Sequence, residues 1–294
     1  MSDIFLDAPS PEEKPSKSPN VFLQLIKGFC YFALFFASQM AAMLILMIYY
    51  AVKKVQEWQQ LGQPIDRNAL SDYMLQMVQA DSNGLLLIYA LLLVLFLAIF
   101  FAIRKKNFFE ETGIRKFPVK LLPSLLILTV GLILMVNGIL NLLPASLLQG
   151  YSEASEFLGE GTFVMSLLTQ ALLAPLTEEL TFRGLMLSRF RKAMPLWVAI
   201  AISSVTFGVV HGHPVWFVYA TLLGSFFCVV YSRTGSILST ILIHALFNAF
   251  GTAMSYAPEG VGIPFAVIIL AVLLGIPITV AGFHMLFRQT AHNK

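Results

Sequence analysis

Charged residues are scarce in this sequence, at 12% of 294 residues, against roughly 25% in an ordinary soluble domain. Together with a hydrophobic content of 57% and a mean hydropathy of +0.78, this scarcity excludes a soluble globular protein. Cysteine is rarer still. Cys30 and Cys228 are the only two, and both lie in apolar stretches, so we expect neither a disulfide nor a thiolate metal site. The excess of 19 basic over 16 acidic residues is too small to indicate a nucleic-acid partner.

Long apolar segments are what the sequence has in place of charge. A hydrocarbon core of about 30 Å requires roughly 20 apolar residues in a helix, and eight segments come close to that length. We therefore predict an all-α, polytopic membrane helix bundle of about eight transmembrane helices. The first segment is too long for the core of a signal peptide and has no obvious cleavage site, so we expect it to be retained. The segments cover residues 28–52, 84–103, 121–143, 162–190, 195–210, 214–231, 236–250 and 263–287.

The distribution of Lys and Arg predicts the orientation of the bundle. With the amino terminus in the cytoplasm, only Lys53, Lys54 and Arg67 of the 19 basic residues lie outside, and the opposite orientation inverts this distribution. We therefore predict that both the N and C termini are cytoplasmic. We also expect a multi-pass protein of the cell membrane.

Composition divides the chain into three predicted regions. Residues 1–20 are rich in Pro, Ser and charge, and we expect them to form a disordered cytosolic tail. Residues 21–120 are predicted to form two transmembrane helices joined by an external segment. Residues 121–294 are predicted to form the catalytic transmembrane core, with its motifs within residues 162–250.

Two external segments are distinctive. In residues 53–83, apolar side chains recur at helical spacing, which predicts a short amphipathic helix lying on the outer membrane surface or packing as a lid over the bundle. These side chains are Ala69, Leu70, Tyr73, Met74, Met77 and Val78. The loop of residues 144–161 has no basic residue and contains Glu153, Glu156 and Glu160, and we interpret it as a solvated acidic loop.

Two adjacent glutamates, Glu178 and Glu179, lie within the fourth apolar segment. Even on mild insertion scales, an acidic residue near the bilayer centre costs on the order of 2.5 to 3.5 kcal/mol, so both need compensation. Arg183 follows Glu179 by four residues, which places them on one helical face in the favourable order for an ion pair. Glu178 has no such local cation. In the alternative interpretation, headgroup water solvates both glutamates at the cytoplasmic end of the segment.

The fifth segment ends at His211, and geometry relates it to Glu178. The turn that joins the fourth and fifth segments is centred near Met194, with Glu178 16 residues before it and His211 17 residues after it. At 1.5 Å per residue, antiparallel helices carry these two side chains to nearly the same depth. Ser204 and Gly208 make the face that precedes His211 small, which permits close packing of a neighbouring helix. His213 is expected on a different side, facing the external boundary.

The seventh segment carries Thr240, His244 and Asn248 every four residues, so they form one polar stripe on an apolar helix. Hydrogen bonding between helices would by itself explain such a stripe. However, carboxylates, an Arg, imidazoles and an amide on three hydrophobic helices that can share a cavity together make up the set of groups expected in an active site.

These residues also carry a family resemblance. Glu178-Glu179-x-x-x-Arg183, Phe207-x-x-x-His211 and His244-x-x-x-Asn248 resemble, in order, the three signature motifs of the CPBP intramembrane endopeptidases. That family includes the CAAX prenyl endopeptidases and bacteriocin-processing or immunity proteins. The resemblance covers about residues 162–250. It implies peptide-bond hydrolysis, with Glu178, His211 and His244 as catalytic residues and Asn248 assisting. We expect Glu179, Arg183 and Phe207 to support the site. Because the sequence shows no endoplasmic-reticulum retrieval signal, the resemblance favours a bacterial plasma membrane over a eukaryotic CAAX role.

The expected chemistry uses water as the nucleophile, because no Ser-His-Asp or Cys-His order indicates a covalent one. Glu178 and His211 would activate the water, and His244 and Asn248 would donate hydrogen bonds to the oxyanion. Glu178, His211 and His244 would also suit a catalytic zinc ion. We favour a mechanism without a metal, while the sequence leaves zinc possible.

Two other functions use the same polar residues. An ion-coupled transporter would use them as a proton or cation relay, although the inverted repeats common in such carriers are not visible. A non-catalytic immunity protein would bind a peptide in the membrane without cleaving it. For the endopeptidase, the expected partners are a peptide or membrane-protein substrate and the lipid bilayer.

Overall fold

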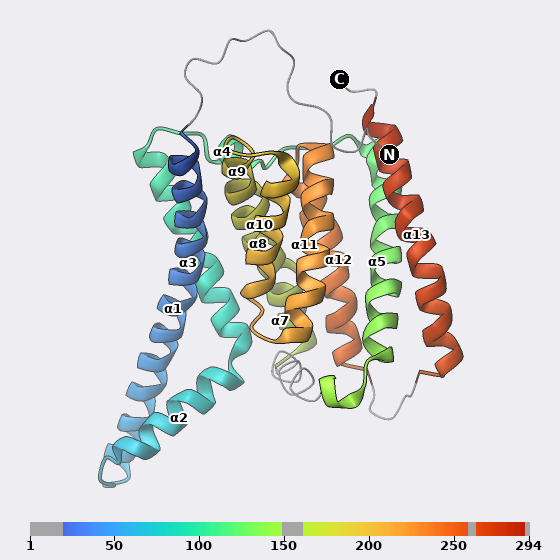
Figure 1. The fold of residues 1–294 in the computed structure, drawn as a ribbon. Coiled ribbons are helices and arrows are strands. Elements are labelled where there is room, and N and C mark those ends of the chain that lie inside the picture. The colour runs from blue at the N-terminus through green and yellow to red at the C-terminus, as the bar shows by residue number, and fades with distance from the viewer. Residues whose placement is uncertain (1–19, 149–160, 258–262, 292–294) are drawn as a thin grey trace.

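The computed structural model describes residues 20–148, 161–257 and 263–291, and every regular element in these ranges is a helix (Figure 1). The predicted tail of residues 1–20 falls outside this description except for Asn20, and so do residues 149–160, which hold the glutamates of the predicted acidic loop. The elements are α1 Val21–Gln60, α2 Arg67–Ala80, α3 Ser82–Ile103, α4 Phe108–Thr112, η2 Val119–Leu121, α5 Leu122–Leu142, α7 Phe163–Ser166, η3 Leu167–Leu173, α8 Ala174–Glu178, η4 Glu179–Leu187, α9 Ser188–Phe190, α10 Leu196–Val209, α11 Pro214–Thr234, α12 Ile237–Ser255 and α13 Phe265–Ala291.

Six helices in the described residues are long and apolar enough to cross a membrane, which makes the chain a polytopic helical membrane protein. These six are α1, α3, α5 with η2, α11, α12 and α13. The other two predicted spans are also helical. One is the unbroken run from α7 to α9, which alternates between α-helical and π-helical turns, and the other is α10, which has only 14 residues.

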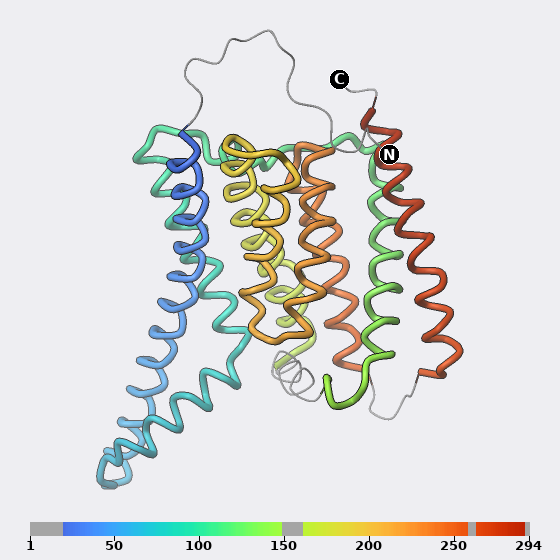
Figure 2. Tube along the Cα trace, viewed as in Figure 1, coloured from blue at the N-terminus to red at the C-terminus, as the bar shows by residue number. Residues whose placement is uncertain are grey.

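The bundle has the motif-bearing helices in the middle, flanked by α1 and α3 on one side and by α5 and α13 on the other (Figures 1 and 2). Helices α5 and α13 pack tightly against each other through glycines. A Cβ at Gly131 or Gly138 of α5 would meet backbone atoms of α13, and one at Gly275 or Gly282 would meet backbone atoms of α5. Small residues of this kind let transmembrane helices approach closely.

Helix α1 is longer than predicted, because it continues past Lys53 and Lys54 to Gln60 and leaves the level of the other helices (Figure 1). The predicted amphipathic helix of the external segment is present as α2. Its Val78 packs against Tyr50 of α1, whose hydroxyl donates to Asp81 Oδ2 at 2.9 Å. None of the described residues that line the central cavity comes from α2, so this helix is not a lid over it.

The N-terminal helices pack directly against the motif-bearing helices. Phe182, in η4, lies with its ring centroid 5.5 Å from that of Phe35 in α1 and 5.1 Å from that of Phe207 in α10. All three rings are buried. This shared aromatic core holds the helix that carries the two glutamates at a defined distance from α10.

Candidate active site

The two glutamates lie where the helical run changes its winding. Glu178 is the last residue of α8, and Glu179 begins the π-helical segment η4, while a second π-helical segment, η3, precedes α8. Pro175 lies in α8, between the two π-helical segments. It has no N–H to donate to the carbonyl four residues earlier, so regular α-helical hydrogen bonding is interrupted there. Single-turn π-helical segments occur often at functional sites.

Glu179 and Arg183 form a buried ion pair. Arg183 Nη1 donates to Glu179 Oε1 at 2.8 Å, and both side chains are 0% exposed. The guanidinium lies over the ring of Phe207 at 4.3 Å and that of Phe227 at 5.2 Å, and Nη2 donates to the Gly224 carbonyl at 3.3 Å. The interpretation that headgroup water solvates both glutamates is therefore wrong for Glu179, which is compensated by protein groups.

His244 connects both glutamates. Its Nδ1 lies 2.8 Å from Glu179 Oε1, and its Nε2 lies 3.6 Å from Glu178 Oε2. A carboxylate paired with an arginine accepts hydrogen bonds, so Nδ1 of His244 must carry a hydrogen and donate it. Nε2 is the nitrogen left to face the cavity. Sequence spacing did not reveal this contact, because 65 residues separate its two partners.

His211 lies in the turn after α10 and is oriented by the backbone of that helix. Its Nδ1 lies 2.8 Å from the Phe207 carbonyl oxygen, which only accepts, so Nδ1 is the donor and Nε2 remains for the cavity. The small face predicted before it does permit close packing, because a Cβ at Gly208 would collide with Phe217 and Thr221 of α11. His213 plays a different part, since its Nδ1 accepts from the Val215 N–H at 3.2 Å and caps α11.

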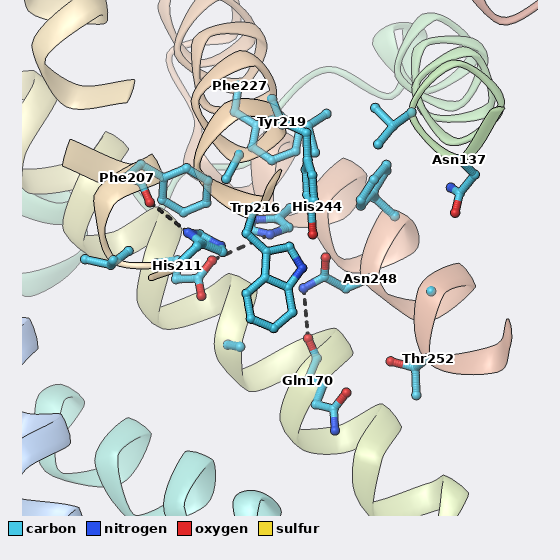
Figure 3. Close-up of a pocket in the computed structure, with 18 of the residues that line it drawn as sticks. Asn137, Gln170, Phe207, His211, Trp216, Tyr219, Phe227, His244, Asn248 and Thr252 are labelled. Carbon is cyan, nitrogen blue, oxygen red and sulfur yellow. Dashed lines mark hydrogen bonds and ion pairs between the residues drawn. The ribbon is translucent and has the colours of Figure 1, made fainter. Parts of the chain in front are cut away.

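The polar stripe of α12 divides between the core and the cavity. Thr240 is fully buried and donates to the Ile237 carbonyl at 2.9 Å, whereas His244 and Asn248 line the cavity. Asn248 Nδ2 donates to the Gln170 carbonyl at 3.0 Å, within the π-helical segment η3 (Figure 3). One of its two amide hydrogens is thereby used to hold the neighbouring helix, and the other is left for a ligand.

Four of the predicted residues meet in one cavity of about 400 Å³, and Phe207 forms part of its wall (Figure 3). These four are Glu178, His211, His244 and Asn248. Glu179 and Arg183 do not line it and lie fully buried beneath it.

Sequence reasoning missed several other residues of the wall, among them Asn137, Trp216, Tyr219 and Thr252. Only Thr252 had a signal, because it continues the four-residue spacing of the α12 stripe. The other three come from α5 and α11, whose sequences show no motif at these positions.

The zinc alternative receives no support from the geometry. Among the described residues, no three or more His, Cys, Asp and Glu side chains are grouped so that they could hold a metal ion. The mechanism below therefore uses no metal ion.

Comparison with known proteins finds relatives of this same region. Residues 160–250 match the family model described as type II CAAX prenyl endopeptidase Rce1-like. The chain is 29% identical over 94 residues to the candidate membrane peptidase YdiL of Bacillus subtilis, covering 32% of this chain and 38% of the relative. It is 29% identical over 107 residues to CAAX prenyl protease 2 of Homo sapiens, covering 30% and 32%.

A third relative, the UPF0177 protein YxdF of Lactococcus lactis, is 31% identical over 98 residues, covering 33% of this chain and 54% of the relative. The chain thus spans between about a third and a half of the length of the curated relatives that it matches. No solved structure matches it.

The matched region contains all three motifs, and the four motif residues that line the cavity come from α8, from the turn after α10 and from α12. Over residues 160–250, the chain is therefore similar to the Rce1-like type II CAAX prenyl endopeptidase (CPBP) family, a family of peptide-bond hydrolases.

Proposed function

We propose that this protein is an intramembrane endopeptidase that hydrolyses peptide bonds with a water molecule activated by Glu178 and His211. The observation that carries the proposal is that Glu178, His211, His244 and Asn248 line one cavity between membrane-spanning helices. The ion pair of Glu179 with Arg183 would need no cavity beside it if it served only the structure. Of the two adjacent glutamates, Glu178 is the one that faces the cavity.

The first step is the attack of water on the scissile carbonyl carbon. The Glu178 carboxylate takes one proton of the water, and the lone pair of His211 Nε2 accepts a hydrogen bond from the other hydrogen. A carbon–oxygen bond forms, and the carbonyl π electrons move to the oxygen. The Phe207 carbonyl keeps Nδ1 of His211 as the donor, so the ring does not need to change tautomer during this step.

The second step is the breakdown of the tetrahedral oxyanion. The second amide hydrogen of Asn248 supports the oxyanion, and so does Nε2 of His244 when that ring is protonated. Nε2 is the nitrogen that can do so, because Nδ1 donates to Glu179. Glu178 then gives its proton to the leaving nitrogen, and the carbon–nitrogen bond breaks. Glu179 is a positioning residue for His244.

The proposed partners are a peptide or membrane-protein substrate and the surrounding lipid. The relatives named CAAX prenyl protease 2 and membrane peptidase YdiL support a peptide bond as the point of attack. We propose a bacterial plasma membrane as its location. The membrane-crossing helices support a membrane, and the relatives from Bacillus subtilis and Lactococcus lactis support a bacterial one.

Replacement of the proposed base tests this function. Glu178→Gln keeps the side-chain shape but cannot take a proton, so cleavage should fall by about 100-fold or more. The purified protein in detergent would be incubated with a mixture of synthetic membrane-protein peptides, and the fragments would be identified by mass spectrometry. Glu110→Gln, the same change at an exposed glutamate of α4, is the matched control and should cleave like the wild type.

Equal fragment yields from the wild type and Glu178→Gln would refute the role of Glu178. If neither the wild type nor Glu110→Gln produces fragments while Glu178→Gln abolishes ion flux into proteoliposomes, the carrier interpretation replaces the endopeptidase.

A further inference from the structure

A second groove lies between α1 and α3, apart from the motif cavity. Its volume is about 260 Å³, and its described wall residues are Lys27, Cys30, Tyr31 and Leu34 of α1 and Phe100 of α3. The α1 residues recur every three or four positions, so they form one stripe along that helix. Figure 1 shows the first turns of α1 beside the last turns of α3, at the end of the bundle where α9 also finishes.

The groove changes from charged to apolar along its length. Lys27 lies in the second turn of α1, and Leu34 lies about 10 Å further along the helix axis. Between them, the ring of Tyr31 meets that of Phe100 edge to face, with centroids 6.3 Å apart. Cys30 and Phe100 are exposed, so the groove is accessible from the surface of the bundle. This order of a cation and then an apolar wall matches the order of headgroup and acyl chain in a phospholipid.

Lys27 belongs to a basic cluster, which consists of Lys27, Lys106, Arg189 and Lys192. The pKa of Lys192, in the turn between α9 and α10, is lowered from its ordinary value, first by the loss of surrounding water and then by the charge of Arg189. Lys27 and Lys106 lower it further, while Glu111 acts in the opposite direction. Three cations from separate segments thus lie within electrostatic range of Lys192.

Glu111 neutralises only part of the basic cluster. Its carboxylate accepts a hydrogen bond from Arg189 Nη2 at 2.8 Å and lies 3.6 Å from Lys106 Nζ. Among the residues that the structure describes, no carboxylate lies within ion-pair distance of Lys27 or Lys192. Two ammonium groups, one of which lines the groove, are thus left for an anion.

We propose that this groove binds one anionic phospholipid, whose phosphate lies against Lys27 and Lys192 and whose acyl chain follows the stripe of α1. Basic pockets between transmembrane helices are sites at which anionic headgroups bind. Hydrogen bonds from ammonium to phosphate oxygens are strengthened by charge, so the headgroup supplies the selectivity. The inference does not depend on the proposed endopeptidase function.

The surface around Lys27 favours a lipid over a soluble phosphate compound. Phe22, Ile26 and Phe29, on the neighbouring positions of α1, are all exposed. Exposed apolar side chains on a membrane-spanning helix face lipid, so an acyl chain reaches the groove without leaving the bilayer. A soluble phosphate would meet the two lysines but leave the apolar part of the groove without a ligand.

Cys30 reports on this groove in the unmodified protein. It is exposed and lines the groove, whereas Cys228 is 0% exposed, so N-ethylmaleimide should label Cys30 first. In detergent, added phosphatidylglycerol should slow this labelling about fivefold or more, because the bound lipid covers the thiol. Phosphatidylcholine with the same acyl chains should change the rate by less than about twofold.

Equal protection of Cys30 by the two lipids would overturn the proposal, because the headgroup charge would then not matter. Protection by glycerol 3-phosphate as strong as that by phosphatidylglycerol would also overturn it, because the ligand would then be a soluble phosphate compound.

Removal of the two lysine charges tests the headgroup contact. The double variant Lys27→Gln with Lys192→Gln should bind phosphatidylglycerol about 10- to 30-fold more weakly, as measured by native mass spectrometry from detergent. The matched control is Lys53→Gln with Lys116→Gln, which removes the same charge at exposed positions outside the groove and should bind like the wild type. Equal weakening in both double variants would contradict the proposal, because net charge alone would then hold the lipid.

Filling the groove tests the acyl-chain contact and leaves both lysines in place. Cys30→Trp should reduce the retained phosphatidylglycerol, because the indole occupies the space of the chain. Ala33→Trp, at a neighbouring exposed position of α1 that does not line the groove, should retain it like the wild type. If Cys30→Trp retains as much phosphatidylglycerol as Ala33→Trp, the groove is not the site and the proposal fails.

Discussion

Two regions of this bundle hold helices together by different means. The glycine pair, α5 with α13, packs through backbone contacts at Gly131, Gly138, Gly275 and Gly282. The motif cluster, which consists of Glu178, Glu179, Arg183 and His244, packs around charges buried among aromatic rings.

The difference shows what membrane packing requires and what it does not. Small residues give close helix contacts at no cost in buried charge, so a bundle of this size can be held together without ionised groups. Buried ion pairs, by contrast, often contribute no more stability than apolar residues of the same volume. The charges of the motif cluster are therefore better explained by a function than by packing.

The largest expected effect comes from removal of one partner of the buried pair. Arg183→Met removes the cation that pairs with the buried Glu179 carboxylate, so the free energy of unfolding should fall by about 3 to 5 kcal/mol. Thermal unfolding in detergent would measure this loss.

The double variant Arg183→Met with Glu179→Leu separates packing from function. It should recover most of the lost stability, because no unpaired charge remains, but cleavage should stay absent, because His244 loses its positioning carboxylate. A double variant that cleaves at the wild-type rate would contradict the positioning role, and one as unstable as Arg183→Met would show that the charges serve packing.

A smaller effect is expected in the glycine pair. Gly282→Ala places a methyl group against backbone atoms of Leu128, which separates the two helices and should cost about 1 to 3 kcal/mol. Ala281→Val adds a larger group at the neighbouring exposed position and should change the unfolding temperature little. Cleavage per folded molecule should be unaffected in both variants. A loss of cleavage in Gly282→Ala without a loss of stability would connect this pair to the active site.

The smallest effect is expected from metal removal. Because the described residues do not group as a metal site, incubation with EDTA followed by dialysis should leave the cleavage rate within about twofold of its starting value. Loss of cleavage that returns on addition of zinc would show that the motif cluster does not act alone.

Much of the fold could be predicted from the sequence. Apart from α1, which is longer than predicted, the helices follow the predicted apolar segments closely. The reason is that each segment must satisfy its own backbone hydrogen bonds in lipid and that the bilayer limits its length. The i,i+4 pair of Glu179 with Arg183 and the helix α2 were also predictable, since both depend only on spacing within one helix.

Two features of the site depended on neighbours that are distant in sequence. The winding around Glu178 and Glu179 changes to π-helical turns, and the only local hint of this was Pro175. The hydrogen bond from Asn248 to the Gln170 carbonyl joins residues 78 positions apart. No periodicity within one segment reports on such a contact.

The sequence by itself determined that the chain crosses a membrane as helices, which side chains of these helices are polar, and which of them share a helical face. It could do so because bilayer thickness and helical periodicity act on each segment separately. Only the tertiary structure decided that Glu179 turns to Arg183 and His244 while Glu178 faces the cavity. These outcomes depend on how the rings of Phe182, Phe207 and Phe227 pack between helices, and that packing is a property of the whole bundle.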